Sequence, residues 1–331
     1  MLKRVLIANR GEIALRILRA CREAGIETVA VYSKADQEAL HVQLATQSLC
    51  IGPAKAADSY LNQSALLTAA KATGCDGIHP GYGFLSENAD FADLCIREGI
   101  TFIGPSGDTI RKAGSKSAAR DLMRRAGVPV TPGSDGPVDT VEQALIWAER
   151  VGYPVLLKAS AGGGGRGIRR CNSPEELPAA FQAAKAEARA CFGDDQMYLE
   201  KLILRPRHIE FQILADRQGN VIHLGDRDCS VQRRNQKLIE EAPAWCLTPE
   251  LRAEMGAAAV RAAQAVGYEN AGTVEFLLDS DGTHFYFMEM NTRIQVEHGI
   301  TELITGVDLV RQQLRIASGL PLDVNQREGC L

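Results

Sequence analysis

Apolar strand patterns alternate with amphipathic helix patterns in the N-terminal third of the chain. Strands are predicted at 3–8, 28–32, 77–79 and 101–103, and helices at 12–23, 61–73 and 88–97. This alternation predicts a parallel sheet with right-handed helical crossovers. Ligands of such sheets bind beyond the carboxyl ends of the strands. Segments 9–12 and 80–88 lie at such ends, so we expect them near a site.

The pattern changes after residue 130. Short helices are predicted at 109–113 and 117–126, and the loop-like segment 130–137 (VTPGSDGP) marks a boundary. A strand at 155–158, a glycine-rich segment, a helix at 174–190 and a strand at 197–201 follow. The last part has strands at 208–215, 220–226, 273–278 and 283–291, with helices at 249–266 and 308–318. These patterns predict an α/β and α+β protein with three parts, 1–114, 115–202 (including a linker at 115–135) and 203–331.

Five polar residues alternate near the C-terminus: Glu289, Asn291, Arg293, Gln295 and Glu297. A period of two places them on one face of a strand. Two carboxylates, an arginine and two amides suit a metal and an anion, whereas the alternative is an edge strand with a polar outer face. Fully extended, the run would span roughly 27 Å, too long for one small site. We therefore expect the chain to leave the strand after Asn291, with metal binding at one end and reaction chemistry at the other.

Glu275 lies inside the apolar strand TVEFLL, where a carboxylate is costly unless it is paired or bound to a metal. The following DSDG turn predicts a hairpin. If Leu278 pairs with His284, Glu275 lies diagonal to Glu289, about 7–8 Å away, so that the two could hold Mg²⁺. The opposite register would place them on different faces.

A glycine-rich run is the main candidate for phosphate binding: Gly162, Gly163, Gly164, Gly165, Arg166 and Gly167. It matches GxGxxG, but the next helix begins too late for a dinucleotide fingerprint. Its backbone N–H groups could instead fold over phosphates, and the alternative is a plain flexible linker. Lys158 ends a strand just before the run, which favours phosphate binding. The basic segment 232–237 (QRRNQK) is either a solvated face or the lining of an anion cleft.

Composition excludes several classes of protein. The 331 residues carry a net charge of −4, which argues against nonspecific nucleic-acid binding. No apolar run approaches the roughly 18 residues of a spanning helix, and the N-terminus lacks a signal-peptide core. Nine cysteines without paired spacing indicate reduced thiols in a cytoplasmic protein. A P-loop motif is absent, and segment 9–12 (NRGE) lacks the glycines of a nicotinamide-binding dehydrogenase.

Motifs along nearly the whole chain together resemble the biotin carboxylase branch of the ATP-grasp superfamily. They are LIANRGEIALRI near the start, HPGYGFLSEN at 79–88, FIGPS at 102–106, GYPVLLKAS, YLEKL, RPRHIEFQ, RDCSVQRR, QKLIEEAP, GTVEFL and MEMNTRIQVEH at 288–298. The resemblance implies an ATP-grasp fold with an N-terminal Rossmann-like domain, a mobile lid carrying the glycine loop, and a C-terminal portion. It also implies the reaction, in which ATP and bicarbonate form carboxyphosphate and the carboxyl group passes to biotin.

The resemblance assigns roles by matched position. It assigns ATP to the glycine run and to Lys116, Lys158, Glu200, Lys201, Ile203, His208, Gln232, Asn235, Glu275, Leu277 and Glu289. It assigns the binding of Mg²⁺ or Mn²⁺ to Glu275, Glu289 and Asn291, and the binding of biotin to Tyr82, Gly83 and Gln295. It assigns the binding of bicarbonate to Lys237, Arg293, Gln295 and Val296. The catalytic residues it implies are Glu297, as the base, together with Arg293 and Lys237.

The implied partners are a biotin carboxyl carrier protein, a carboxyltransferase and a second copy of the chain in a homodimer. The reaction would be the first half of an acetyl-CoA or other acyl-CoA carboxylase, as in fatty acid biosynthesis. Two positions depart from the family, since Asn235 replaces a histidine and Gly299 a proline. The chain also ends before the part that carries a biotin-stabilising arginine. The alternatives are another ATP-grasp ligase, such as the carbamoyl-phosphate type, and a truncated form that binds ATP without carboxylating biotin.

Overall fold

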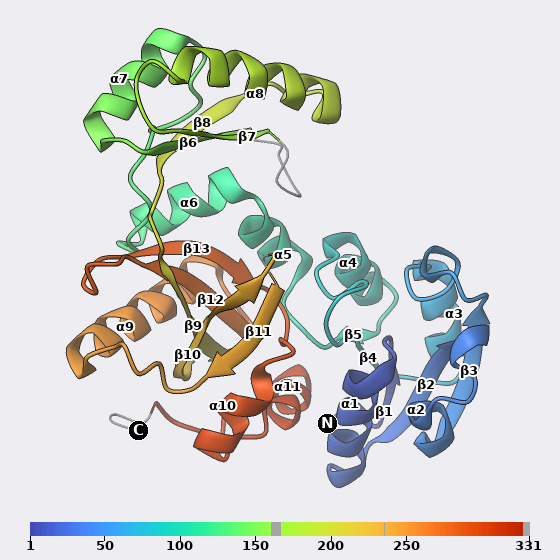
Figure 1. The fold of residues 1–331 in the computed structure, drawn as a ribbon. Coiled ribbons are helices and arrows are strands. Elements are labelled where there is room, and N and C mark those ends of the chain that lie inside the picture. Colours follow the sequence, from blue (N-terminus) through green and yellow to red (C-terminus); the bar gives the residue numbers. More distant parts are fainter. Residues whose placement is uncertain (160–166, 235, 327–331) are drawn as a thin grey trace. The chain divides into compact units, whose positions relative to one another are not determined.

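The computed structural model describes residues 1–159, 167–234 and 236–326, without the side chains of residues 116, 117 and 192 (Figure 1). The chain divides into two compact units. The first unit comprises Met1–Val128, His208–Phe276 and Glu289–Leu331, and the second comprises Pro129–Arg207 and Leu277–Met288. Among the described residues, no helix has both the length and the apolarity that crossing a membrane requires.

The first unit begins with a five-stranded parallel sheet in the order β3-β2-β1-β4-β5. Its strands are β1 (Arg4–Ile7), β2 (Glu27–Ser33), β3 (Gln47–Gly52), β4 (Gly77–His79) and β5 (Thr101–Phe102). The crossovers contain α1 (Gly11–Glu23), α2 (Leu40–Leu44), α3 (Gln63–Ala72) and α4 (Ala89–Arg97). The predicted parallel sheet is confirmed. The sequence patterns missed β3 and α2, because β3 is a largely exposed edge strand and α2 is very short.

Helices cover both faces of this sheet, as the alternation along β1 requires. Val5 and Ile7 pack in one buried cluster with α1, and Leu6 and Ala8 pack in another with α3 and α4. The strand order reverses at β1, so the carboxyl ends of β1 and β4 form the ligand-binding edge that such sheets use. The segments that follow these two strands are those predicted to lie near a site.

The first unit also contains most of a second sheet, in the order β11-β10-β9-β12-β13. These strands are β9 (Arg207–Ala215), β10 (Val221–Arg233), β11 (Gln236–Glu241), β12 (Asn270–Leu278) and β13 (Phe285–Asn291). The helices are α5 (Gly107–Gly114), α6 (Lys116–Arg125), α9 (Pro249–Val266), α10 (His298–Thr305) and α11 (Leu309–Ala317). The basic segment predicted as a face or a cleft lining thus belongs to a β10–β11 hairpin, and β10 extends to Arg233, beyond the predicted end at 226.

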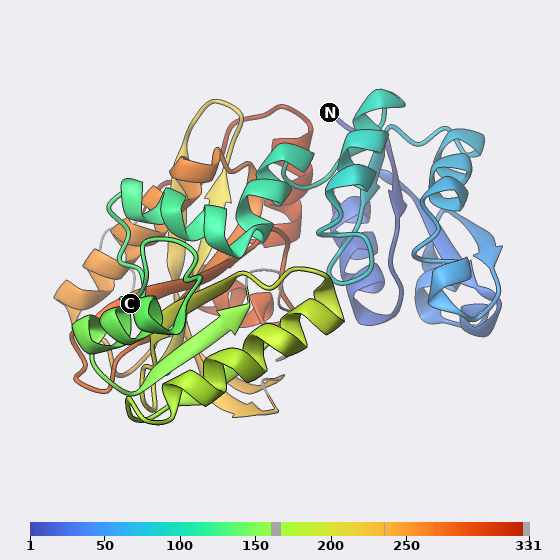
Figure 2. The ribbon, with the colours of Figure 1, turned by 90° about the horizontal axis from the view of Figure 1, so that it is seen from above.

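The second unit is a small α/β layer. Its antiparallel sheet has the order β7-β6-β8, with β6 (Val155–Ala159), β7 (Ile168–Cys171) and β8 (Met197–Lys201). Helices α7 (Val141–Val151) and α8 (Leu177–Phe192) lie on one face of that sheet and enclose one buried apolar cluster (Figures 1 and 2). The patterns predicted β6, α8 and β8 but missed α7 and β7.

Candidate functional site

The alternating polar run divides where predicted. Strand β13 ends at Asn291, residues 292–297 leave the sheet, and α10 begins at His298. Glu289 and Asn291 therefore lie on a strand, whereas Arg293, Gln295 and Glu297 lie on the connection that follows. The prediction that the chain leaves the strand after Asn291 is confirmed.

Lys237, on β11, is the centre of a cluster of buried carboxylates. Its Nζ lies 2.5 Å from Glu210 Oε2, 2.8 Å from Glu275 Oε1 and 2.7 Å from Glu297 Oε1. Burial by itself would lower the pKa of Lys237, but the three carboxylates outweigh it and raise that pKa above its ordinary value. Lys237 is therefore an ammonium that partly offsets the negative charge of these three carboxylates.

Glu210 is a cluster member that the sequence interpretation missed. It lies on β9 in the segment His208–Ile213 and is fully buried. Burial opposes its ionisation, but Arg227, His208 and Lys237 hold its pKa well below the usual range. The signal that singled out Glu275, a carboxylate within an apolar strand, applies equally to Glu210.

His208 adds a second positive charge to the cluster. Its Nε2 lies 3.1 Å from Glu275 Oε2 and 3.6 Å from Glu210 Oε2. Burial would lower the pKa of His208, but hydrogen bonds to these two carboxylates raise it to about 9. Gln232, which is exposed, lies 3.2 Å from Nδ1 of His208. The structure thus brings two predicted ATP-binding residues together beside the carboxylate cluster.

Glu275 joins the two ends of the polar run. Its Oε1 accepts hydrogen bonds from Asn291 Nδ2 at 2.9 Å and from Gln295 Nε2 at 3.0 Å. Burial opposes ionisation of Glu275, but His208 and Lys237 lower its pKa overall, so it is a carboxylate. Glu289 lies two residues before Asn291 on β13 and is exposed.

The donor chemistry here fits a hard divalent cation. The carboxylate oxygens of Glu275 and Glu289 and the amide oxygen of Asn291 are ligands that Mg²⁺ prefers. Two groups of His, Cys and Glu side chains place potential ligand atoms within 4.8 Å of one another: His208, Glu210 and Glu275, and Glu210, Cys229 and Glu297. The raised pKa of His208, about 9, leaves both ring nitrogens protonated, and burial raises the pKa of Cys229, which leaves a protonated thiol. These two groups are less suited to a metal.

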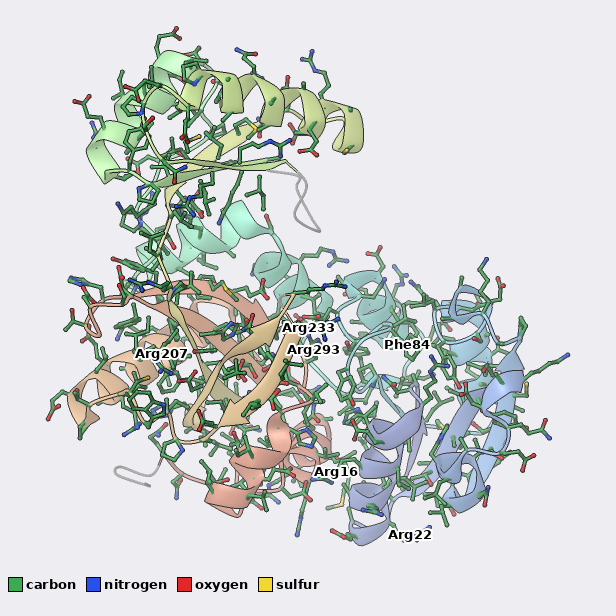
Figure 3. The ribbon with its side chains drawn as sticks, viewed as in Figure 1. Arg16, Arg22, Phe84, Arg207, Arg233 and Arg293 are labelled. Carbon is green, nitrogen blue, oxygen red and sulfur yellow. The ribbon has the colours of Figure 1, made fainter. Side chains whose placement is uncertain are left out.

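Arg293, which is labelled in Figure 3, makes three hydrogen bonds through its guanidinium. Its Nε donates to Glu87 Oε2 at 2.9 Å, one Nη donates to Asn291 Oδ1 at 3.1 Å, and the other donates to the Ile294 carbonyl at 3.3 Å. Among the described residues, one hydrogen on each Nη has no further partner. Two parallel N–H groups of this kind can bind a planar oxyanion through both of its oxygens. Val296, three residues further along the same connection, is 63% exposed.

The loop after β4 carries the residues assigned to biotin. Asn9, after β1, donates from Nδ2 to the Pro80 carbonyl at 2.7 Å and to the Tyr82 carbonyl at 2.8 Å. The Tyr82 hydroxyl donates to Glu12, and Gly83 has a left-handed φ of +67°. Glu87, at the end of the loop, accepts from the backbone N–H of Thr292 at 3.2 Å as well as from Arg293. Both ends of the loop are therefore tied, one to the parallel sheet and the other to the segment after β13.

The second unit holds a separate group of predicted ATP residues. Lys158, on β6, forms an ion pair with Glu200 on the neighbouring strand β8. Lys201 donates to the carbonyls of Gly152 and Tyr153 at 2.9 and 3.0 Å.

The other predicted ATP residues are less informative here. Ile203 is buried, Leu277 is half-buried, and the Gly167 N–H donates to Glu187 at 2.9 Å. Outside the described residues lie Gly162, Gly163, Gly164, Gly165, Arg166 and Asn235, and the side chain of Lys116 is likewise not described.

Comparisons with known proteins give a consistent result. The family described as "Biotin carboxylase, N-terminal domain" matches residues 1–110, and "Carbamoyl-phosphate synthase L chain, ATP binding domain" matches residues 115–325. Biotin carboxylase 1 of Bacillus subtilis is 57% identical over 328 residues, which cover 99% of this chain and 73% of that protein. The biotin carboxylase of Nostoc sp. is 59% identical over 323 residues, which cover 98% of this chain and 72% of that protein.

Solved structures agree with this similarity. The β-γ-ATP complex of the Campylobacter jejuni biotin carboxylase is 51% identical, with a TM-score of 0.90 over 98% of this chain and 72% of that one. The biotin carboxylase domain dimer of Hydrogenobacter thermophilus 2-oxoglutarate carboxylase, in complex with MgADP, ADP and bicarbonate, is 54% identical, with a TM-score of 0.88 and the same coverage.

Proposed function

Because the chain belongs to the biotin carboxylase family, we propose that it uses ATP and bicarbonate to carboxylate biotin on a biotin carboxyl carrier protein. One observation carries the proposal. The ammonium of Lys237 contacts Glu297, and the partly free guanidinium fork of Arg293 begins the same short connection, in a first unit that also contains the loop after β4. The arrangement suits a small planar anion that must lose a proton before it reacts.

In the proposed first step, bicarbonate binds to Lys237, Arg293, Gln295 and the backbone of Val296. Glu297 accepts the bicarbonate proton, and the resulting oxygen nucleophile attacks the γ-phosphorus of ATP. The bond between that phosphorus and ADP breaks, giving carboxyphosphate and ADP. Phosphoryl transfer of this kind depends mainly on positioning and charge neutralisation, which two fixed cations provide. In the second step the C–O bond of carboxyphosphate breaks, the leaving phosphate takes the proton of the biotin N–H, and the carboxyl carbon bonds to that nitrogen near Tyr82 and Gly83.

Glu297 suits the role of general base because of its position. Its carboxylate lies 2.7 Å from Lys237, and its residue follows directly after the proposed anion contacts Gln295 and Val296. A base must lie within hydrogen-bond reach of the proton it removes. We propose that Glu275, Glu289 and Asn291 hold Mg²⁺ or Mn²⁺, whose chemistry when bound is to neutralise phosphate charge.

The remaining assignments stay proposals. ATP would be bound by the glycine run and by Lys116, Lys158, Glu200, Lys201, Ile203, His208, Gln232, Asn235 and Leu277. The proposed three-part division, at about residues 114 and 202, would separate the part that carries the glycine run from the other two parts. A carboxyltransferase, a homodimer and a cytoplasmic location complete the proposal. The Hydrogenobacter thermophilus domain, which is described as a dimer, supports the homodimer.

Phosphate release from MgATP by the purified chain tests the proposal. The assay is run with and without bicarbonate, and with and without free biotin. We expect release that requires bicarbonate and rises with biotin. Release that requires bicarbonate but ignores biotin, and rises instead with another acceptor, would favour a different ATP-grasp ligase. If ATP binds and is not cleaved under any condition, the proposed activity is wrong for this chain.

A further inference from the structure

Arg227 is a fully buried charge in the first unit. It lies on β10, directly opposite Glu210 on β9, and its side chain is fully excluded from solvent. A buried guanidinium is costly unless its donors are satisfied. Here all five N–H groups have acceptors: Glu210 Oε1 at 2.5 Å, Gln212 Oε1 at 2.9 Å, Thr301 Oγ1 at 2.9 Å, Thr273 Oγ1 at 3.2 Å and Gln295 Oε1 at 3.1 Å.

These acceptors come from separate parts of the chain. Glu210 and Gln212 belong to β9, Thr273 to β12 and Thr301 to α10, while Gln295 lies on the connection after β13. A rigid planar fork with five donors fixes the relative positions of its acceptors in a way that a flexible ammonium cannot. Arg227 therefore locks the connection that carries Gln295 and Glu297 against the sheet that carries Glu210.

Two of the acceptors, Glu210 and Gln295, contact or belong to the proposed bicarbonate site. Glu210 uses its second oxygen, Oε2, to hold the Lys237 ammonium at 2.5 Å. Gln295 gives its amide oxygen to Arg227, which leaves its Nε2 as the group that faces Glu275, at 3.0 Å. Arg227 thus sets both the place of the site's lysine and the direction in which the Gln295 amide presents its donor.

We propose that Arg227 is a positioning residue for bicarbonate, acting through Glu210 on Lys237 and through Gln295 on the anion side of the pocket. The proposal rests on the proposed function. Arg227 itself does not touch a substrate, because it is fully buried and each of its N–H groups already has a protein acceptor. Its effect is to hold two anion-binding groups in one arrangement, so its loss affects bicarbonate more than ATP.

The conservative variant Arg227→Lys tests this. It keeps the positive charge but has three donors, so it cannot satisfy five acceptors at once. We expect the KM for bicarbonate to rise at least about tenfold and kcat to fall, with the KM for MgATP within about twofold of wild type. A general structural defect would not separate the two substrates in this way.

Arg252→Lys is the matched control. Arg252 also pairs with a fully buried carboxylate, Asp226, at 2.8 Å, but it donates otherwise to the Ala244 carbonyl and not to the cluster. We expect it to lower the melting temperature without moving the KM for bicarbonate. If both lysine variants change the two KM values alike, or if Arg227→Lys leaves bicarbonate kinetics unchanged, the positioning role is wrong.

Thr273→Val and Thr301→Val keep the test decisive if Arg227→Lys does not fold. Each removes one acceptor of Arg227 at nearly constant volume. We expect the double variant to fold and to raise the KM for bicarbonate about threefold or more, and an unchanged KM would overturn the proposal. Wild-type protein is assayed in parallel. If wild type shows no bicarbonate-dependent ATP cleavage, the proposed function is wrong. If wild type is active and the variants match it, the positioning role of Arg227 is wrong while the proposed function stands.

Discussion

Glu87 and Arg293 are 206 residues apart in the sequence and form an ion pair, with Arg293 Nε donating to Glu87 Oε2 at 2.9 Å. The same carboxylate accepts the backbone N–H of Thr292 at 3.2 Å. The contact ties the end of the loop after β4, which is proposed to contact biotin, to the guanidinium proposed to bind bicarbonate. It also occupies Nε, so that the two Nη groups are the ones left for an anion.

Substitution Glu87→Gln should therefore weaken bicarbonate use. The Glu87 side chain is 43% exposed, so solvent screens the pair and the effect should be moderate. We expect kcat/KM for bicarbonate to fall about three- to tenfold, measured by ADP formation at saturating MgATP. Asp90→Asn is the control, because Asp90 follows closely on α4 and pairs with Arg111 at 3.2 Å, and its kinetics should match wild type.

Loss of the proposed base should affect turnover rather than nucleotide binding. Glu297→Gln keeps the size of the side chain but removes the group that accepts the bicarbonate proton. We expect kcat for bicarbonate-dependent ATP cleavage to fall at least about 100-fold, with ATP affinity by calorimetry nearly unchanged. Glu302→Gln, on the next turn of α10, should retain turnover. Turnover by Glu297→Gln at the wild-type rate would remove Glu297 from the mechanism.

Lys237 also has a structural role that can be measured separately. Replacing it with methionine leaves Glu210, Glu275 and Glu297 without their shared cation, and these carboxylates are almost completely buried. Breaking a buried ion pair by removing one partner typically costs about 3–5 kcal/mol, so the free energy of unfolding of Lys237→Met should fall by about that amount. Urea denaturation checks this. A variant as stable as wild type would mean that the carboxylates share protons or bind another cation.

Some elements could be predicted locally and others could not. Helix α9 was predicted with its observed bounds, because Thr248 caps it with a hydrogen bond from the Leu251 N–H, a proline follows, and Gly267 ends it in the left-handed region. Strand β11 was missed, because its residues are strongly polar and it forms only by pairing with β10, where Lys237 lies opposite Gln232. Its stability as a strand comes from a partner and not from its own pattern.

The same distinction applies to the site. Glu275, Glu297 and Lys237 could be proposed from their motifs, and the structure brings all three together. Arg227 and Glu87 lie within the quoted motifs RDCSVQRR and HPGYGFLSEN, but those motifs gave neither residue a role, because their partners are distant in the sequence. The acceptors of Arg227 lie between Glu210 and Thr301 in the chain, so they come together only in the folded protein. Glu87 and Arg293 are likewise distant in the sequence and become neighbours only when the first compact unit has folded.

The proposed metal site makes a prediction about Mg²⁺ dependence. Glu289→Gln replaces a carboxylate ligand by a weaker amide ligand. We expect the free Mg²⁺ concentration for half-maximal ATP cleavage to rise about tenfold, while saturating Mg²⁺ restores much of the rate. The control Asp279→Asn changes a carboxylate on the hairpin turn before β13 and should leave the Mg²⁺ dependence unchanged. An unaltered Mg²⁺ requirement in Glu289→Gln would place the metal elsewhere.

His79 should make the stability of the protein sensitive to mild acid. It is fully buried at the end of β4, where Nδ1 accepts the Gly81 N–H at 3.1 Å and Nε2 lies 3.2 Å from Gln313 Oε1. The bond from Gly81 requires an unprotonated Nδ1, so the ring is neutral. Burial lowers the pKa of His79 from 6.5 to about 3, although the bond to Gln313 opposes this shift.

The sign of the effect follows from proton binding. Between about pH 6.5 and 3 the unfolded chain binds a proton at His79 and the folded chain does not, so this contribution to stability is complete above pH 6.5 and is lost as the pH falls. The slope for one proton is about 1.4 kcal/mol per pH unit. His79→Asn retains an acceptor for Gly81 and should be less stable overall, with a slope reduced by up to that amount between pH 6 and about 4 in urea denaturation. The exposed His284, which has a raised pKa beside Asp281, is the control, because His284→Gln should not reduce this slope. Equal slopes in wild type and His79→Asn would show that His79 takes up its proton in the folded state.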